Sequence, residues 1–151
     1  MVIVTVGELL DRAEGFEKRL ESYYVAIREQ SQNNGVRLLT YYLSKHRRRL
    51  RGALGELDPA ALQRVRRIEL KHGDDATLCD EPRPMSVPPA VVTGEELLAS
   101  AVEHDSLLIA LYKRIRQHQL IAEAQAFFDA LIHVEERDIV MLKKMLAVHY
   151  F

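Results

Sequence analysis

The residues TVGELLDRAEGFEKRLESYYVAIR (5–28) return in altered form as TGEELLASAVEHDSLLIALYKRIR (93–116). An ungapped alignment at an offset of 88 residues makes nine positions identical and places Glu17 on Asp105. Both stretches open with Thr-x-x-Glu before an apolar-periodic run, the pattern in which a threonine and a glutamate cap a helix start. The sequence therefore predicts an internal duplication, with helices that begin near residues 6 and 94.

Each copy leads into a second periodic segment, at about 35–54 and 121–148, after a short polar break. The repeated unit is thus a helical hairpin. A lone hairpin cannot bury its apolar stripe, so we expect hairpin one (5–54) and hairpin two (94–149) to pack together. The prediction is one all-α domain over 1–151, a four-helix bundle made of duplicated hairpins.

The crossover between the hairpins covers residues 55–93. Asp58 followed by Pro59 predicts the start of a short helix that runs to about His72. The four prolines at 82, 84, 88 and 89 then forbid regular structure. We expect this long connection to bring hairpin two to the end of the bundle where the first helix starts.

Composition excludes several classes of protein. The 151 residues are 48% hydrophobic and 28% charged, with a net charge of −1, so no global field attracts nucleic acid or an anionic membrane. The single cysteine, Cys79, has no partner for a disulfide and no cationic neighbour to make it reactive. The apolar opening is too short for a membrane span. We expect a soluble, cytoplasmic protein without nucleic-acid or membrane partners.

Alternating steps of three and four residues trace the stripe of each main helix that faces a bundle core. Each predicted stripe has six positions, and they are mostly apolar. The four stripes are Leu10, Ala13, Glu17, Leu20, Tyr24 and Ile27; Val36, Leu39, Leu43, His46, Leu50 and Ala53; Leu98, Ala101, Asp105, Leu108, Tyr112 and Ile115; and Phe128, Leu131, Glu135, Asp138, Leu142 and Met145.

Tyrosines aside, only Glu17, His46, Asp105, Glu135 and Asp138 are polar in these stripes, and each is third or fourth of its six. Helix midpoints coincide in an up-and-down packing, so the five side chains should meet in one slab. Several buried carboxylates require compensation by cations, by shared protons or by an arginine from a flank. Two divalent metal ions are the simplest answer, and iron, manganese or zinc suits these ligands.

Each half resembles the ferritin-like, rubrerythrin-related pattern. In that pattern one helix of a hairpin donates a glutamate, and the next donates Glu-x-x-His to a two-metal site. The matching positions are Glu17 with Tyr24, Asp105 with Tyr112, Leu43 with His46, and Glu135 with Asp138.

The resemblance implies a ferritin-like homodimer that binds one or two iron ions and has oxidoreductase activity toward oxygen or peroxide. The chain has no Cys-x-x-Cys pair, so electrons would come from an external donor. The implied ligands are Glu17, His46 and Glu135 for one ion, and Asp105, Asp138 and Glu135 for a second. Tyr24 and Tyr112 would support them, and no catalytic residue is assigned.

The departures from the family pattern favour an alternative. Leu43 stands where a bridging glutamate is expected, and Asp138 replaces the second histidine. The alternative is a non-catalytic bundle with a degenerate site, acting as an interaction or structural module. Its acids would then be protonated or paired with Arg28 or Arg47. The basic run His46–Arg51 is interpreted as a solvated helix end, and His104 is predicted at the surface.

Overall fold

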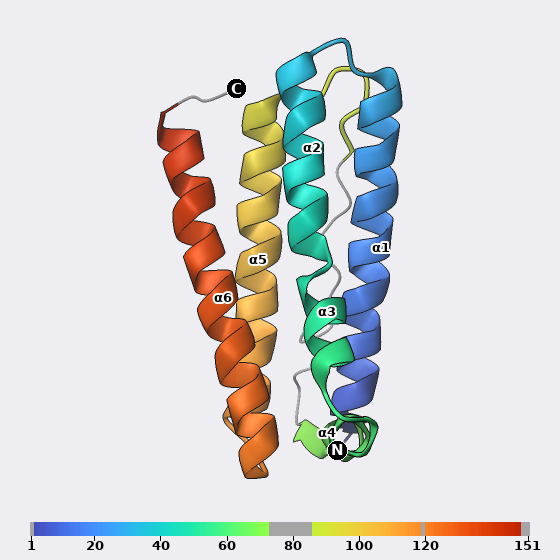
Figure 1. Cartoon of the computed structure of the whole chain (residues 1–151), viewed down its shortest axis with the longest axis vertical. Helices are drawn as coiled ribbons and strands as arrows, with labels where there is room; N and C mark the ends of the chain where they lie inside the picture. Colours follow the sequence, from blue (N-terminus) through green and yellow to red (C-terminus); the bar gives the residue numbers. More distant parts are fainter. Residues whose placement is uncertain (1, 73–85, 119, 149–151) are drawn as a thin grey trace.

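Helices form most of the computed structural model, which describes residues 2–72, 86–118 and 120–148. The prediction of an all-α protein is confirmed, and the described residues add only a two-stranded sheet (Figure 1). The elements are β1 (Val2–Thr5), α1 (Val6–Gln30), α2 (Asn34–Arg47), α3 (Arg49–Glu56), α4 (Pro59–Arg66), β2 (Glu69–His72), α5 (Gly94–Arg116) and α6 (Ala122–Ala147).

The two predicted helix starts are confirmed by their caps. Thr5 Oγ1 accepts a hydrogen bond from the Glu8 backbone N–H at 3.1 Å, and Thr93 Oγ1 accepts one from Glu96 at the same distance. At Thr93 the capping box is complete, because the Glu96 carboxylate also accepts from the Thr93 backbone N–H at 3.2 Å. These caps satisfy backbone donors that a helix start leaves unpaired.

The second segment of hairpin one is not the single helix predicted over 35–54. It breaks at Arg48, which ends α2 and precedes α3. Like charges three and four residues apart destabilise a helix, and the run from Lys45 to Arg51 contains several such pairs. The break follows Arg47, whose side chain is buried.

The predicted helix after Asp58 exists, and Asp58 Oδ2 accepts from the Ala61 backbone N–H at 3.4 Å. It ends at Arg66, so the prediction that it reaches His72 is wrong. Residues Glu69–His72 instead form β2, which pairs antiparallel with β1 in the register Thr5 opposite Glu69. The β-branched residues of β1 favour a strand, and the pairing buries Val4 and Leu70.

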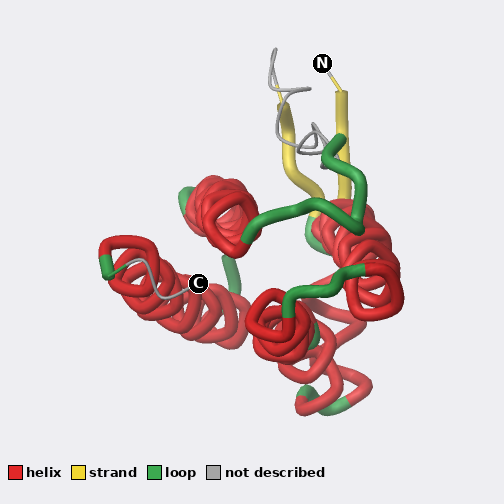
Figure 2. Tube along the Cα trace, turned by 90° about the horizontal axis from the view of Figure 1, so that it is seen from above, coloured by secondary structure: helices red, strands yellow, loops and turns green. Residues whose placement is uncertain are grey.

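The long helices α1, α2, α5 and α6 lie side by side along the longest axis of the molecule (Figures 1 and 2). Within this set, α1 packs against α2, α5 packs against α6, and α2 lies next to α5. At one end, residues 31–33, which join α1 to α2, line the same pocket as residues 90–94 before α5. At the opposite end, α4 meets the start of α6, where Arg64 Nε lies 2.5 Å from Glu123 Oε1.

The expected direction of hairpin two is therefore wrong. Helix α5 begins at the end where α1 finishes, not where α1 starts, so α5 runs parallel to α2 (Figure 1). A connection between neighbouring helix ends needs only a few residues, whereas this one joins opposite ends of the molecule. That is the physical reason for its length. Cys79, Pro82 and Pro84 of the connection lie outside the described residues.

The predicted stripes form the core. All of their positions are buried except Ala53 and Met145, which are half-buried. The apolar side chains fall into two clusters, one around Leu10, Leu50 and Phe128 and the other around Leu20, Leu39 and Leu98. The polar stripe positions lie between these clusters along the helices. We call this level of the molecule the polar layer.

Candidate metal centre

The five polar residues that the stripes predicted are all buried in the polar layer. Their exposed fractions are 6% for Glu17 and His46, 0% for Asp105, 3% for Glu135 and 4% for Asp138. The prediction that they lie in the interior is confirmed. Their role as metal ligands stays a prediction.

Three of the four buried carboxylates converge. One oxygen each from Asp105 of α5 and from Glu135 and Asp138 of α6 lie within 4.8 Å of one another. Glu135 and Asp138 are three residues apart, so they share one face of α6, and α5 packs directly against that helix. We call these residues the acid trio. Such a spacing allows three carboxylates to bind one cation.

His46 of α2 contacts the acid trio through Asp138. Its Nδ1 lies 2.5 Å from Asp138 Oδ1, and its ring packs against Tyr42 with ring centroids 4.2 Å apart. Despite this close contact, Nδ1 and both Asp138 oxygens have no partner with hydrogen-bond geometry among residues 2–72, 86–118 and 120–148. The sequence grouped His46 with Glu17, whereas the structure places it beside Asp138.

Two arginines contribute positive charge to the layer. Arg47, the last residue of α2, donates from Nη2 to Asp105 Oδ1 at 2.6 Å, and its side chain is buried. Arg49 Nη2 lies 3.6 Å from Asp138 Oδ1. The interpretation of the basic run as a solvated helix end is therefore wrong for Arg47, although Arg48 and Arg51 are exposed as expected. Arg47 lies next to the predicted stripe, and its long side chain reaches the interior.

Arg28, the other arginine that the sequence named as a partner for the acids, does not join the trio. Its Nε donates to Thr40 Oγ1 at 2.9 Å, and its Nη2 donates to Ser44 Oγ. Its nearest carboxylate contact is with Glu21, at 3.6 Å. The pairing of buried acids with an arginine therefore applies to Arg47 alone of these two.

Glu17 enters the layer from α1, outside the acid trio. Its Oε1 lies 3.8 Å from His104 Nε2. His104 is buried and stacks on Phe16, with ring centroids 4.7 Å apart and planes 28° apart, so its predicted surface position is wrong. The duplication could have predicted that His104 is buried, because an offset of 88 residues aligns it with the apolar residue Phe16.

Tyr24 and Tyr112 are both buried next to the polar layer. Burial, together with nearby acids such as Asp105, raises the pKa of Tyr24 to about 12 even though Arg47 opposes the shift. Burial and the charges of Glu17 and Glu135 raise the pKa of Tyr112 well above its ordinary value. Both phenols are therefore neutral donors at physiological pH. Their supporting role toward a metal stays a prediction.

Burial also changes how the carboxyls ionise. It raises the pKa of Glu17 to about 8 and that of Glu135 to about 7, with Arg47 lowering both. Burial and the contact with Asp138 raise the pKa of Asp105 to about 9, although Arg47 opposes this. For Asp138, burial is outweighed by His46, Asp105 and Arg49, which lower the pKa to about 2. Near neutral pH the layer therefore holds protons that a bound cation would displace.

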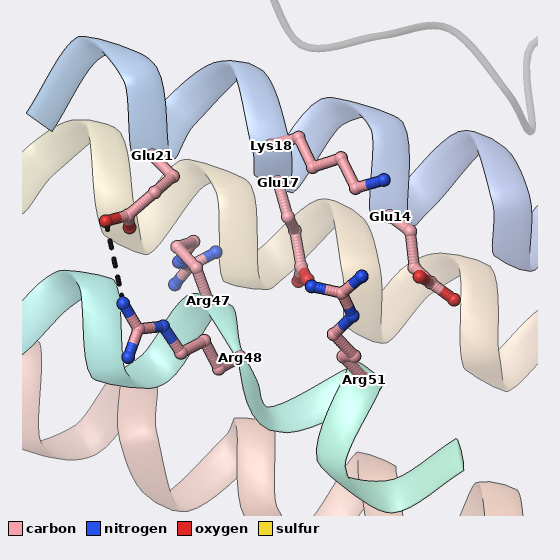
Figure 3. A pocket seen from close by; sticks show the side chains of 7 residues that line it. All are labelled: Glu14, Glu17, Lys18, Glu21, Arg47, Arg48 and Arg51. Atoms are coloured by element: carbon pink, nitrogen blue, oxygen red, sulfur yellow. Dashed lines mark ion pairs between the residues drawn. The ribbon is translucent and has the colours of Figure 1, made fainter. Parts of the chain in front are cut away.

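A pocket of about 230 Å³ opens between α1 and the α2–α3 segment (Figure 3). Glu17 and Arg47 are its buried lining residues, and Arg48 at its rim lies 3.9 Å from Glu21. Its lining residues are Glu14, Glu17, Lys18, Glu21, Arg47, Arg48 and Arg51. The pocket therefore reaches the polar layer at Glu17 and Arg47.

Compared with models of known protein families, with curated proteins and with solved structures, the chain matches none. Within the part of the chain that the structure describes, no helix has the length and apolar character needed to cross a membrane.

Proposed function

We propose that this chain is a metal-binding protein in which the acid trio and His46 hold one divalent transition-metal ion. The observation that carries the proposal is the acid trio, whose three buried carboxylates each bring an oxygen within 4.8 Å of the others, with the His46 imidazole in contact with Asp138. Three carboxylates and one imidazole suit Fe²⁺, Mn²⁺ or Zn²⁺. Iron is the ion that the family resemblance implies.

The charge balance of the polar layer supports the same conclusion. Its carboxylates are Glu17, Asp105, Glu135 and Asp138, and its guanidiniums are Arg47 and Arg49. If all four carboxyls were ionised, four negative charges against two positive charges would leave an excess of two. Because uncompensated buried charge is costly, these carboxyls must either stay protonated or receive cations. One divalent ion supplies the missing charge.

We also propose that the fold is a ferritin-like bundle built from two duplicated hairpins. Equivalent residues from the two hairpins meet at its centre, which supports this proposal. Phe16 and His104, related by the offset of 88 residues, stack on each other. His46 and Asp138, which hold corresponding positions in the second helix of each hairpin, are in contact. Such pairing is what a two-fold arrangement of the two copies would produce.

For an iron-loaded protein, the resemblance adds oxidoreductase activity toward oxygen or peroxide, a homodimeric state and an external electron donor. Iron would supply electron-transfer chemistry in a site with little water. The residues of this chain would hold the ion through the acid trio and His46, and Arg47 would fix the orientation of Asp105 through its 2.6 Å hydrogen bond. Tyr24 and Tyr112 would keep neutral hydroxyl groups beside it.

Metal analysis tests this function directly. Protein purified without added metal, and then titrated anaerobically with Fe²⁺ or with Co²⁺, should take up one ion per chain. Glu135→Ala should lose this ion because it removes a trio carboxylate. Glu136→Ala is the matched control, since Glu136 is the exposed neighbour of Glu135. No uptake by the natural protein, or equal uptake by Glu135→Ala, would reject metal binding here.

The hydrogen bond from Arg47 to Asp105 favours a second candidate, a non-catalytic bundle whose acids are neutralised by arginines and protons. On this alternative, chelators and added metal leave the denaturation midpoint unchanged. A metal-binding protein would instead gain about 2.7 kcal/mol when the free ion is at 100 times its Kd. Urea unfolding with and without Co²⁺ therefore separates the two candidates.

A further inference from the structure

We infer that Arg47 is a built-in cation that limits the polar layer to one metal ion, and that its replacement by a neutral residue opens a second cation site between Glu17 and His104. The inference rests on the proposed function in one respect, because it assumes that the acid trio takes the first ion.

The first evidence is the position of the Arg47 guanidinium, which lies between carboxylates of two different helices. It donates to Asp105 of α5 at 2.6 Å and lines the same pocket as Glu17 of α1 (Figure 3). Its side chain is 3% exposed, and its Nε and Nη1 have no hydrogen-bond partner among the residues with described positions. A buried guanidinium with spare donors beside acids acts mainly as a fixed positive charge.

The second evidence is the charge count. With Arg47 present, one divalent ion neutralises the excess of the layer. A second ion would make the layer positive. Without Arg47 the excess negative charge grows to three, more than a single divalent ion compensates. The negative charge of the polar layer therefore accommodates either Arg47 or a second metal ion, but not both.

The third evidence is the set of donors around Arg47. Glu17 Oε1 and His104 Nε2 lie 3.8 Å apart, and two ligands that are each about 2.1 Å from one ion are at most about 4.2 Å apart. Both ring nitrogens of the buried His104 lack hydrogen bonds to any described residue. A carboxylate and an imidazole are ligands for the same class of divalent ion.

The experiment counts Co²⁺ ions per chain by equilibrium dialysis and native mass spectrometry. The natural protein is expected to bind one ion even in large excess of Co²⁺, whereas Arg47→Met is expected to bind two. Arg48→Met is the matched control, because its side chain is adjacent but 75% exposed, and it should bind one. Adding Glu17→Gln to Arg47→Met should return the count to one.

Two ions in the natural protein would overturn the inference, as would one ion in every Arg47 variant. Arg47→Gln, which keeps an N–H donor for Asp105, is the second variant and carries the same expected count of two. If the natural protein binds no ion but Arg47→Met binds one through Glu17, the role of Arg47 stands and the proposed function fails. No ion in any variant rejects both.

Discussion

The protonation of Glu17 links the polar layer to the stability of the protein. Burial raises its pKa from 4.5 to about 8, so between these values the folded protein keeps a proton that the unfolded chain has lost. Stability then falls as pH rises, because the folded state binds more protons than the unfolded state.

Metal-free protein should therefore lose stability between pH 5 and pH 8, with Glu17 contributing on the order of 3 kcal/mol. Glu17→Gln removes this titration, so its unfolding free energy should change less over the same range. Urea denaturation at both pH values measures the difference. Equal slopes in the natural protein and the variant would show that Glu17 does not retain a proton on folding.

Metal binding by the acid trio should strengthen as pH rises, whereas the stability of the metal-free protein should fall. An ion that binds Glu135, with its pKa of about 7, and Asp105, with its pKa of about 9, must displace their protons. Affinity for Co²⁺ should therefore rise at least about 100-fold between pH 6 and pH 8, since each displaced proton contributes up to about tenfold per pH unit. Competition with a chelator of known affinity measures this, and a flat profile would contradict the protonation of the trio.

At the scale of helices and strands, local sequence predicted where helices begin and which of their residues are buried. The Thr-x-x-Glu patterns located both helix starts, and Asp58 with Pro59 located the third. The strand β2 could not be predicted in this way, because its partner β1 lies more than 60 residues earlier. Only that long-range pairing, which local periodicity does not record, turns Glu69–His72 from a helix into a strand.

The complete capping box gives a prediction at this scale. Thr93→Ala removes the side-chain acceptor that fixes the start of α5, and it should destabilise the protein by about 1 kcal/mol. Ser106→Ala is a suitable control, since Ser106 is an exposed residue of α5 whose hydroxyl only bonds back to the Val102 carbonyl. Chemical denaturation should show at most a small change for Ser106→Ala. Equal losses for both variants would mean that the cap contributes little.

At the scale of the whole molecule, the stripes predicted which acids would be buried, but not how their charges are balanced. The five polar positions could be found because they interrupt regular apolar stripes. Arg47 could not, because it lies one residue outside a stripe and its length alone brings it inward. The direction of α5 also could not be predicted from the sequence. A long connection is compatible with either end of the molecule until the packing of α5 on α6 and α2 selects one.

The division of the core into two apolar clusters has a consequence for local opening. Helices usually fray from their ends, where amide hydrogens exchange fastest with solvent. Here the ends of the long helices are held by apolar packing, whereas their central turns surround poorly paired charge. In metal-free protein at pH 8, deuterium should therefore enter the turns around Glu17, Asp105 and Glu135 before the flanking turns. Bound Co²⁺ should slow the exchange there most, and mass spectrometry of peptic fragments would detect this reversal of the usual order.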